Sequence, residues 1–242
     1  MSPARTARAL ARETITREIL DSARARLGTD GAAALSLRAV ARDVEMVSSA
    51  VYRYFPSRDA LLTALLIEAY GELGHAAESA DAGVTDRSDT AARWLATFRA
   101  VRRWCVAHPG EFGLLYGTPV PGYAAPRDTV DPATRVVRVL VRIVGDAYAA
   151  GARPPVVPAA AATTGTVAPA LAFIAEHGLM AEPDLSDDEL PEVVRRALMA
   201  WTALFGVLSF ELFGHLVGSV TDPEAWLDQV ALRLAADLGI QA

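Results

Sequence analysis

Residues 35–66 read LSLRAVARDVEMVSSAVYRYFPSRDALLTALL, and this stretch decides the fold. Its first part has apolar residues at helical spacing, and Ser36 stands where it can cap the amide groups of a short helix. The inner face of that helix would carry Leu37, Val40, Ala41 and Val44. A first short helix is therefore predicted from residue 37 onward.

The same spacing resumes at Ser48, with Val51 and Phe55 turned inward, until Pro56 ends the helix. Ser57 is then placed to cap a longer helix. Only about three residues separate the two short helices. A tight turn of that length between short helices is typical of a helix-turn-helix, whose second helix lies in the DNA major groove. We therefore predict a helix-turn-helix over about residues 36–55.

A further helix precedes this motif and completes a small core. Ile15, Ile19, Ala23 and Leu27 recur every fourth residue and form one apolar stripe, which ends at Gly28. Three helices with a common core are thus expected between about residues 9 and 55.

The outward face of the third helix carries the side chains that would meet DNA, namely Ser48, Ser49, Tyr52 and Arg53. Small hydroxyl residues permit close approach to base edges, whereas Tyr and Arg can donate to phosphates. Arg38, Ser57 and Arg58 add guanidinium and amide donors for the flanking backbone.

Charge divides the chain in the same way. Residues 1–58 hold 10 Arg against 6 Asp or Glu, and the remainder holds 13 Arg against 23 Asp or Glu. A basic N-terminal part on an acidic body confines any polyanion contact to that part.

This stretch resembles the DNA-binding region of the TetR family of bacterial transcriptional regulators. The shared features are the Ala-Val-Ala of the first short helix, the Val-Tyr-Arg-aromatic-Phe run, and the Pro-Ser-Arg-Asp-Ala-Leu-Leu that opens the next helix. The resemblance implies that Arg38, Ser48 and Ser49 reach bases. It also implies that Tyr52, Tyr54 and Arg58 hold phosphates.

Two positions depart from the family pattern. Glu45 stands where the family usually has glycine in the turn, and it tolerates positive φ less well. Val47 stands where a capping Ser or Thr is common, so that Ser48 is expected to take over the cap.

Other interpretations of the N-terminal part remain open. Tyr52 and Tyr54 could be half-buried packing residues of the small core. An Arg-rich helical segment could also lie on an anionic membrane surface, although its short apolar stripes are already committed to one another.

The rest of the chain shows helical periods and no strand alternation. Expected helices cover about 57–80, 88–108, 111–116, 130–151, 163–178, 188–217 and 223–239. The breaks between them contain SADAGVTDRSD, GTPVPGYAAPRD, RPPVVP and AEPDLSDDEL. The most apolar run, residues 197–210, is shorter than the roughly 20 residues that cross a bilayer, so a buried helix is expected there.

Residues 104–123 hold Cys105, His108 and Glu111, which raises the possibility of catalysis. No feature makes Cys105 unusually acidic, and a single Cys with four scattered His residues supplies no metal-ligand spacing. Neither an enzyme nor a metal or cofactor site is predicted. The stretch instead resembles the WHG (Trp-His-Gly) class of TetR-family C-terminal domains, with His108-Pro109-Gly110 capping a helix end.

A body of this size implies a second task, most simply sensing a small molecule and holding a dimer. Aromatic residues favour a largely apolar ligand, and the expected ligand-binding residues are Phe98, Trp104, Tyr116, Tyr123, Phe173 and Trp201. Most single rings of this kind are ordinary core residues. Residues 190–217 are apolar on two faces, one containing Phe205 and the other Phe210, so one face is expected to meet a partner. With Trp226 and Val230 of the last helix, these residues are the predicted dimer interface.

These observations predict an all-α protein with a DNA-binding domain in residues 1–58 and a ligand-binding and dimerisation domain in residues 59–242. The expected function is that of a cytoplasmic, homodimeric transcriptional regulator, a repressor released from a palindromic duplex operator by a small effector. A helical enzyme or lipid-binding protein that retains an unused helix-turn-helix is the alternative.

Overall fold

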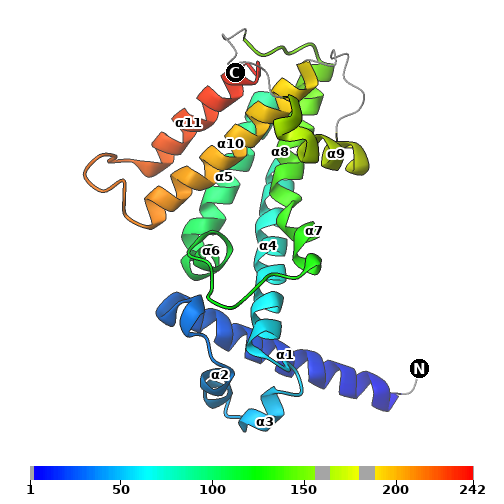
Figure 1. Cartoon of the computed structure of the whole chain (residues 1–242), viewed down its shortest axis with the longest axis vertical. Coiled ribbons are helices and arrows are strands. Elements are labelled where there is room, and N and C mark those ends of the chain that lie inside the picture. Colours follow the sequence, from blue (N-terminus) through cyan, green and yellow to red (C-terminus); the bar gives the residue numbers. More distant parts are fainter. Residues whose placement is uncertain (1–2, 156–163, 180–188, 242) are drawn as a thin grey trace. The chain divides into compact units, whose positions relative to one another are not determined.

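The computed structural model describes residues 3–155, 164–179 and 189–241. Within these ranges the chain forms α-helices, three short 3-10 helices and no strand, which confirms the predicted all-α class (Figure 1). The helices are α1 (Pro3–Asp30), α2 (Leu37–Asp43), α3 (Ser48–Val51), α4 (Arg58–Gly83), α5 (Thr90–Ala107), α6 (Pro109–Tyr116), α7 (Val130–Ala133), α8 (Arg135–Ala149), α9 (Ala168–His177), α10 (Glu189–Leu212) and α11 (Pro223–Asp237). The 3-10 helices are η1 (Ala32–Ala34), η2 (Arg127–Thr129) and η3 (Thr164–Val167).

The chain divides into two compact units. Unit 1 comprises Met1–Glu72 and Ala107–Ala133, and unit 2 comprises Leu73–Val106 and Thr134–Ala242. The boundary predicted after residue 58 falls at the start of α4, whereas the division lies inside that helix. Because α4 is unbroken, its periodicity gives no sign of where one unit ends.

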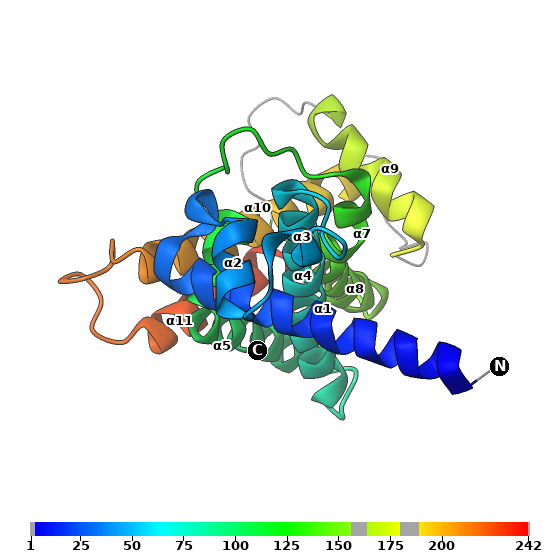
Figure 2. The ribbon, with the colours of Figure 1, turned by 90° about the horizontal axis from the view of Figure 1, so that it is seen from below.

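Unit 1 is built on the apolar residues that the sequence places inward. Its buried cluster joins α1, α2, α3 and the first turns of α4, and it includes Ile19, Leu27, Val40, Val51, Phe55, Leu61 and Leu65. The helices α2 and α3 lie on the same side of α1 (Figure 1), and the N-terminal end of α1 projects past both of them (Figure 2).

The helix α6 crosses α1 at two glycines. A Cβ atom on Gly110 would lie 2.6 Å from the backbone nitrogen of Gly28 and 2.8 Å from the carbonyl carbon of Leu27. Backbone atoms cannot move aside as a flexible side chain can, so only glycine permits this crossing. Pro109 is the first residue of α6, with His108 at its N-cap. The predicted helix end at 108–110 is therefore also the start of the next helix.

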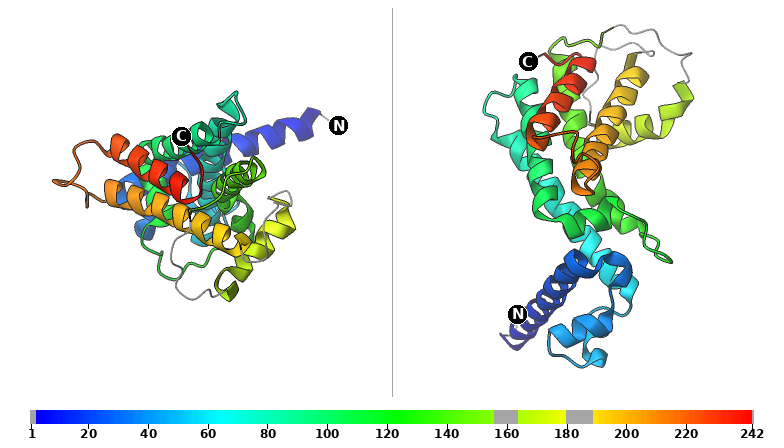
Figure 3. Two further views of the ribbon diagram at one scale, coloured as in Figure 1. Left: turned by 90° about the horizontal axis from the view of Figure 1, so that it is seen from above. Right: turned by 90° about the vertical axis from the view of Figure 1, so that its left-hand side faces the viewer.

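Unit 2 packs α5, α8, α10 and α11 around a second core. Trp94, Phe98, Leu140, Leu204 and Leu227 are all buried there. The indole Nε1 of Trp94 donates to the carbonyl oxygen of Ala231 at 2.9 Å, which satisfies the one polar atom of that ring. Figure 3 shows α10 and α11 running side by side.

Several helix ends differ from the prediction for local reasons. The first helix continues past Gly28 to Asp30, and it ends where Gly31 adopts φ 76°. The helix expected over 188–217 ends at Leu212, because Gly214 and Gly218 take left-handed backbone conformations in the turns that follow. Thr134 separates α7 from α8, where one helix was expected. The expected breaks at 153–158 and 181–190 lie largely outside the described residues.

The helix α10 extends beyond the most apolar run, residues 197–210. It has 24 residues, and by length and composition alone it could cross a membrane. The same composition is found in core helices of globular proteins, and α10 contributes Val193, Ala200, Leu204 and Leu208 to the core of unit 2.

Candidate DNA-binding site

The turn between α2 and α3 has the tight geometry that the sequence predicts. The amide of Met46 donates to the carbonyl oxygen of Ala41 at 2.8 Å. Glu45 has φ 53° and is the one non-glycine residue with positive φ among the described residues. A left-handed conformation costs a residue with a side chain about 1–2 kcal/mol relative to glycine. Glu45 thus takes the left-handed conformation for which the family pattern has glycine, and the turn tolerates this strain.

The caps of the two short helices differ from the prediction. Ser36 is the N-cap of α2, but its hydroxyl makes no capping bond; its carbonyl oxygen accepts the amides of Ala39 and Val40. Val47 is the N-cap of α3, and Ser48 is its first helical residue, so the expectation that Ser48 takes over the cap is wrong. Only Ser57 caps as predicted, because its Oγ accepts the amide of Ala60 at 3.0 Å.

The exposed side chains of residues 48–53 are those that the sequence predicts to face outward. Ser49, Tyr52 and Arg53 are exposed and Ser48 is half-buried, whereas Val51 and Phe55 are buried. Tyr52 keeps 46% of its surface exposed, so it is not a packing residue. Arg38 on α2 is also exposed. Arg38 lies on α2 and Ser48 and Ser49 lie on α3. Tyr52 and Arg53 follow α3, because this helix ends at Val51 and does not continue to Pro56 as predicted.

Tyr54 and Arg58 have mainly internal contacts. The half-buried ring of Tyr54 packs against the core of unit 1, and the Arg12 guanidinium lies 5.0 Å from its centroid. Arg58 donates from Nε to Leu35 O at 2.9 Å, and from Nη2 to Ala32 O at 3.0 Å and Ala33 O at 2.9 Å. Its guanidinium thus ties the segment before α2 to the start of α4. A phosphate contact by either residue stays a prediction.

Some of the described arginines of unit 1 pair with carboxylates, and others do not. On the side of α4, Arg17 and Arg24 pair with Glu68, and Arg24 also pairs with Glu72. Arg26 pairs with Asp43, and its hydrogen bonds lower the pKa of that carboxyl group. In the described part of the chain, Arg38 and Arg53 have no carboxylate within ion-pair distance. Within the described ranges, positive charge without a carboxylate partner therefore lies on the helix-turn-helix, and also on Arg8 and Arg12 of α1.

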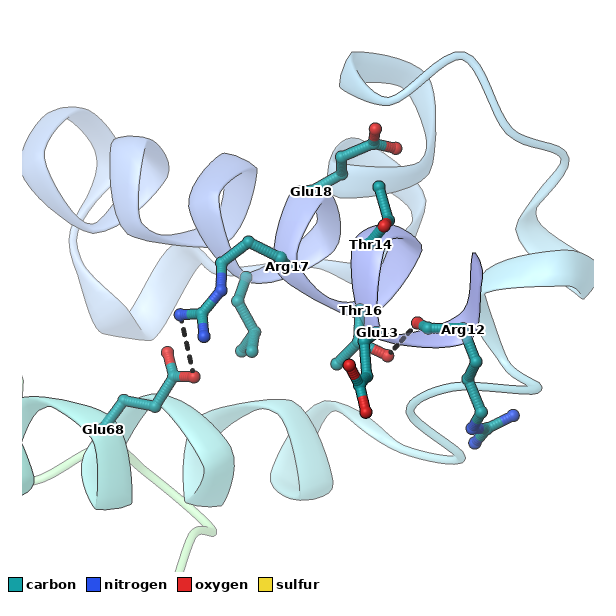
Figure 4. A pocket seen from close by; sticks show the side chains of 8 residues that line it. Arg12, Glu13, Thr14, Thr16, Arg17, Glu18 and Glu68 are labelled. Carbon is teal, nitrogen blue, oxygen red and sulfur yellow. Dashed lines mark hydrogen bonds and ion pairs between the residues drawn. The ribbon is translucent and has the colours of Figure 1, made fainter. Parts of the chain in front are cut away.

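A hollow of about 650 Å³ lies along α1, and Figure 4 shows its lining residues. Glu13, Glu18 and Glu68 stand beside Arg12 and Arg17. The hydroxyls of Thr14 and Thr16 are bonded to the carbonyl oxygens of Leu10 and Arg12 at 3.0 and 2.8 Å. Leu20 is the one apolar side chain among the described residues of its lining, so this hollow does not match the expected apolar effector.

The six predicted ligand-binding residues do not form one cluster within a unit. Tyr116 and Tyr123 belong to unit 1, and Phe98, Trp104, Phe173 and Trp201 belong to unit 2. Phe98 is fully buried beside Trp94, with ring centroids 4.9 Å apart. The hydroxyl of Tyr123 lies 2.9 Å from Thr63 Oγ1, and its ring packs on the core of unit 1. Ordinary packing accounts for Phe98 and Tyr123.

Two further hollows lie within the units and are lined by other residues. One, of about 480 Å³, is lined by Thr90, the turn after α8 and the C-terminal residues Gly239–Gln241. The other, of about 310 Å³, lies beside the crossing of Gly28 and Gly110. A pocket built from the six predicted residues stays a prediction.

The predicted dimer residues differ sharply in exposure. Phe205 is 7% exposed and belongs to the core of unit 2, whereas Phe210 is 56% exposed. Trp226 on α11 is 42% exposed, and Val230 is half-buried. Of the two apolar faces of α10, only the one with Phe210 is open to solvent.

Cys105 has no catalytic setting. It is fully buried in unit 2, and desolvation raises the pKa of its thiol far above the usual range. A thiol that stays protonated is a poor nucleophile.

Two features were missed at the sequence level. The first is the contact of Arg12 with Tyr54, since the two residues are remote in sequence. The second is the exposure of Val47, which is 71%. The exposure of Val47 could have been inferred from its position directly before Ser48. A residue at the N-cap has a non-helical backbone, so helical periodicity does not place its side chain on the inner face.

Comparisons with known proteins agree with this geometry. Residues 19–65 match the family described as bacterial regulatory proteins, tetR family, and residues 94–234 match the tetracyclin repressor-like, C-terminal domain. The match does not specify the narrower WHG class, which stays a prediction. HTH-type transcriptional regulators of Mycobacterium tuberculosis and Mycobacterium bovis are each 40% identical over 235 residues, which is 94% of this chain and 94% of each relative.

Solved structures extend the likeness to the fold. The crystal structure of SCO4313, described as regulatory, is 30% identical with a TM-score of 0.69 and covers 93% of this chain and 97% of its own. A protein of unknown function from Rhodococcus sp. RHA1 is 25% identical with a TM-score of 0.63 and 92% coverage of both chains. The helix-turn-helix, the helical body and these relatives together establish that the chain belongs to the TetR family of bacterial transcriptional regulators.

Proposed function

We propose that this regulator is a cytoplasmic homodimer that represses transcription from a palindromic operator and is released from DNA by a small, largely apolar effector. Family membership makes the chain a transcriptional regulator and not an enzyme, which removes the alternative of a helical enzyme with an unused helix-turn-helix. Repression, release and the dimer are the finer parts of the proposal.

One observation carries the DNA-binding part. The face formed by α2, α3 and the turn after α3 combines exposed hydroxyl and phenol groups with the guanidinium groups of Arg38 and Arg53, which have no carboxylate within ion-pair distance in the described part of the chain. We assign Arg38, Ser48 and Ser49 to base edges, where small or forked donors can approach. We assign Tyr52, Arg53 and Ser57 to phosphates, which fix the register of the protein on the duplex.

Selection of bound fragments from random duplex DNA tests this proposal directly. The expected product is a palindrome whose half-sites lie about one or more helical turns apart, because a two-fold dimer presents two recognition helices. Failure of the intact protein to enrich any duplex would contradict the proposal.

Arg53→Ala is expected to weaken specific and non-specific duplexes by similar factors. Each lost phosphate contact reduces the slope of log affinity against log salt by about 0.9, so a dimer should lose about 2 in slope. The melting temperature should not change, because Arg53 is exposed. Fluorescence anisotropy over a salt series measures both effects.

Two matched variants distinguish a phosphate contact of Arg53 from a general effect of surface charge and from a loss of stability. Arg17→Ala removes a surface arginine already paired with Glu68, and it should leave the salt slope nearly intact. Arg58→Ala should lower the melting temperature, because three carbonyl oxygens lose their donor. An unchanged salt slope in Arg53→Ala would overturn the phosphate assignment.

The effector would act on a two-state equilibrium. It would favour a conformation whose two recognition helices are wrongly spaced for successive major grooves, and it can shift the equilibrium only by its differential affinity. The body holds many aromatic side chains and, among its described residues, few buried charged ones, which supports an apolar ligand with one or two polar groups.

A thermal-shift screen of apolar and charged metabolites is expected to yield mainly apolar hits that also release the operator. A ligand at 100 times its Kd stabilises the binding state by about 2.7 kcal/mol, which such a screen detects readily. Hits confined to highly charged compounds, or an effector that binds residues 1–55, would contradict this part of the proposal.

A further inference from the structure

Val47 is the most exposed large apolar side chain of unit 1 among the described residues, at 71%, ahead of Leu10 at 58% and Val130 at 55%. It stands between the turn and α3, next to the hydroxyl residues Ser48 and Ser49. Val47 is thus an isolated apolar side chain on the polar face that is proposed to contact DNA. Its exposure there needs a physical explanation.

Helix stability does not supply that reason. Val47 occupies the N-cap of α3, with φ −67° and ψ 139°, and its carbonyl oxygen accepts the amide of Ala50 at 2.8 Å. Any residue could supply that backbone contact. Its side chain, however, cannot accept an amide, so α3 has no side-chain cap. A Ser or Thr here would cap the helix, and valine forgoes that stabilisation.

The charge around Val47 indicates what approaches it. Arg38 and Arg53 lie on the same helix-turn-helix without carboxylate partners among the described residues, which favours a polyanion over an apolar ligand or protein surface. In the DNA major groove, the 5-methyl group of thymine is the one large apolar group that a base edge presents. The isopropyl group of Val47 matches that chemistry.

We propose that Val47 is a specificity-determining residue that reads a thymine by packing against its 5-methyl group. This inference rests on the proposed function, because it requires α3 to enter the major groove. It goes beyond that function by naming the base and the chemical group that one side chain recognises. Val47 would then favour thymine over other bases at one operator position, and it would contribute little to the affinity for DNA of other sequence.

Replacement of thymine by deoxyuridine tests the contact, since it removes the methyl group and leaves every hydrogen-bonding atom in place. Each thymine of the selected operator is replaced singly, in both half-sites at once. For the unmodified protein, replacement at one position per half-site should lower the affinity about sixteenfold, because each of the two buried methyl groups contributes about fourfold. Replacement at the other thymines should change affinity less than about twofold.

Val47→Ser is the decisive variant, because serine removes the isopropyl group and supplies a cap. It should bind the thymine and uracil operators equally, with a melting temperature that is unchanged or raised. Val130→Ser is the matched control: it changes another exposed valine of unit 1, outside the helix-turn-helix, and should keep the full uracil effect.

Two outcomes overturn the inference while operator binding stands. One is that no thymine responds to loss of its methyl group, and the other is that Val47→Ser keeps the same uracil sensitivity as the unmodified protein. If no duplex is selected at all, the proposed function itself fails, and the two failures are therefore distinguishable.

Discussion

Phe210→Glu is expected to give a folded monomer that binds the operator at least about a hundredfold more weakly, since linking two binding modules contributes about 10²–10⁴ in affinity. The side chain is 56% exposed on α10, so a charge there does not disturb the core of unit 2. In a dimer it would bury an unpaired carboxylate at the interface. Sedimentation velocity and circular dichroism measure the two properties separately.

The α10 surface around Phe210 has the form of a helix-packing face. Met199, Ala203, Gly206 and Phe210 follow one another at intervals of four, three and four residues, so they form one stripe. Met199 and Gly206 are exposed and Ala203 is half-buried. The two small residues would allow a second helix to approach closely, and Trp226 of the neighbouring α11 adds apolar area.

Phe205→Glu is the control for this experiment. Phe205 is 7% exposed, so a glutamate there would be buried in unit 2 without a partner. Phe205→Glu should destabilise the folded subunit and not only the dimer. Its helical circular dichroism signal should therefore be lost at a lower temperature than in the unmodified protein. A Phe210→Glu variant that remains dimeric and folded would place the interface elsewhere.

Arg93→Met should cost unit 2 about 3–5 kcal/mol of unfolding free energy, the usual cost of breaking a buried ion pair from one side. Arg93 is 1% exposed on α5. Its Nε lies 2.7 Å from Asp81 Oδ1 of α4, and its Nη1 lies 2.7 Å from Asp146 Oδ2 of α8. Three helices are thus joined by one guanidinium group. Urea unfolding followed by circular dichroism measures the loss.

Arg99→Met is the matched control on the same helix. Arg99 pairs with Asp228, but 43% of its side chain is exposed, and a pair of that kind contributes about 1 kcal/mol or less. Equal losses for the two variants would show that burial of the Arg93 network adds nothing.

The same network predicts an acid-dependent loss of stability. Burial alone would raise the pKa of Asp81, but hydrogen bonds and positive charge from Arg93 and Arg87 outweigh it and lower that pKa. A carboxyl group whose pKa is lowered on folding stabilises the protein above its unfolded pKa of about 4, and this contribution disappears as the pH falls through the folded pKa. The stability of unit 2 should therefore decline below about pH 4. In Arg93→Met the part that depends on Asp81 should be smaller, because Arg93 no longer pairs with that carboxyl group and Arg87 still does.

Local sequence predicted the DNA-binding unit well because its determinants are local. The spacing of Leu37, Val40, Val51 and Phe55 defines one inner face through helical register alone, and these residues are buried as predicted. The outward position of Ser49, Tyr52 and Arg53 follows from the same register. Ser57 caps as predicted, because a cap bond reaches only three residues along the chain.

Other features depend on residues that only the tertiary structure brings together. Arg58 contacts carbonyl oxygens 23–26 residues away, and nothing in its own neighbourhood distinguishes that role from a phosphate contact. The extension of unit 1 to residues 107–133 depends on the crossing of Gly28 and Gly110, which are far apart in sequence.

The sequence by itself determined the all-α class, the helix-turn-helix and the two apolar faces of α10. Only the tertiary structure decided which of those faces is free, because Phe205 and Phe210 are equally apolar in sequence and differ only in what packs against them. Hydrophobic periodicity reports that a face will be buried. The partner that buries it is chosen by long-range packing. That is why the exposure of Phe210 and Val47 and the carbonyl contacts of Arg58 are evident only in the folded protein.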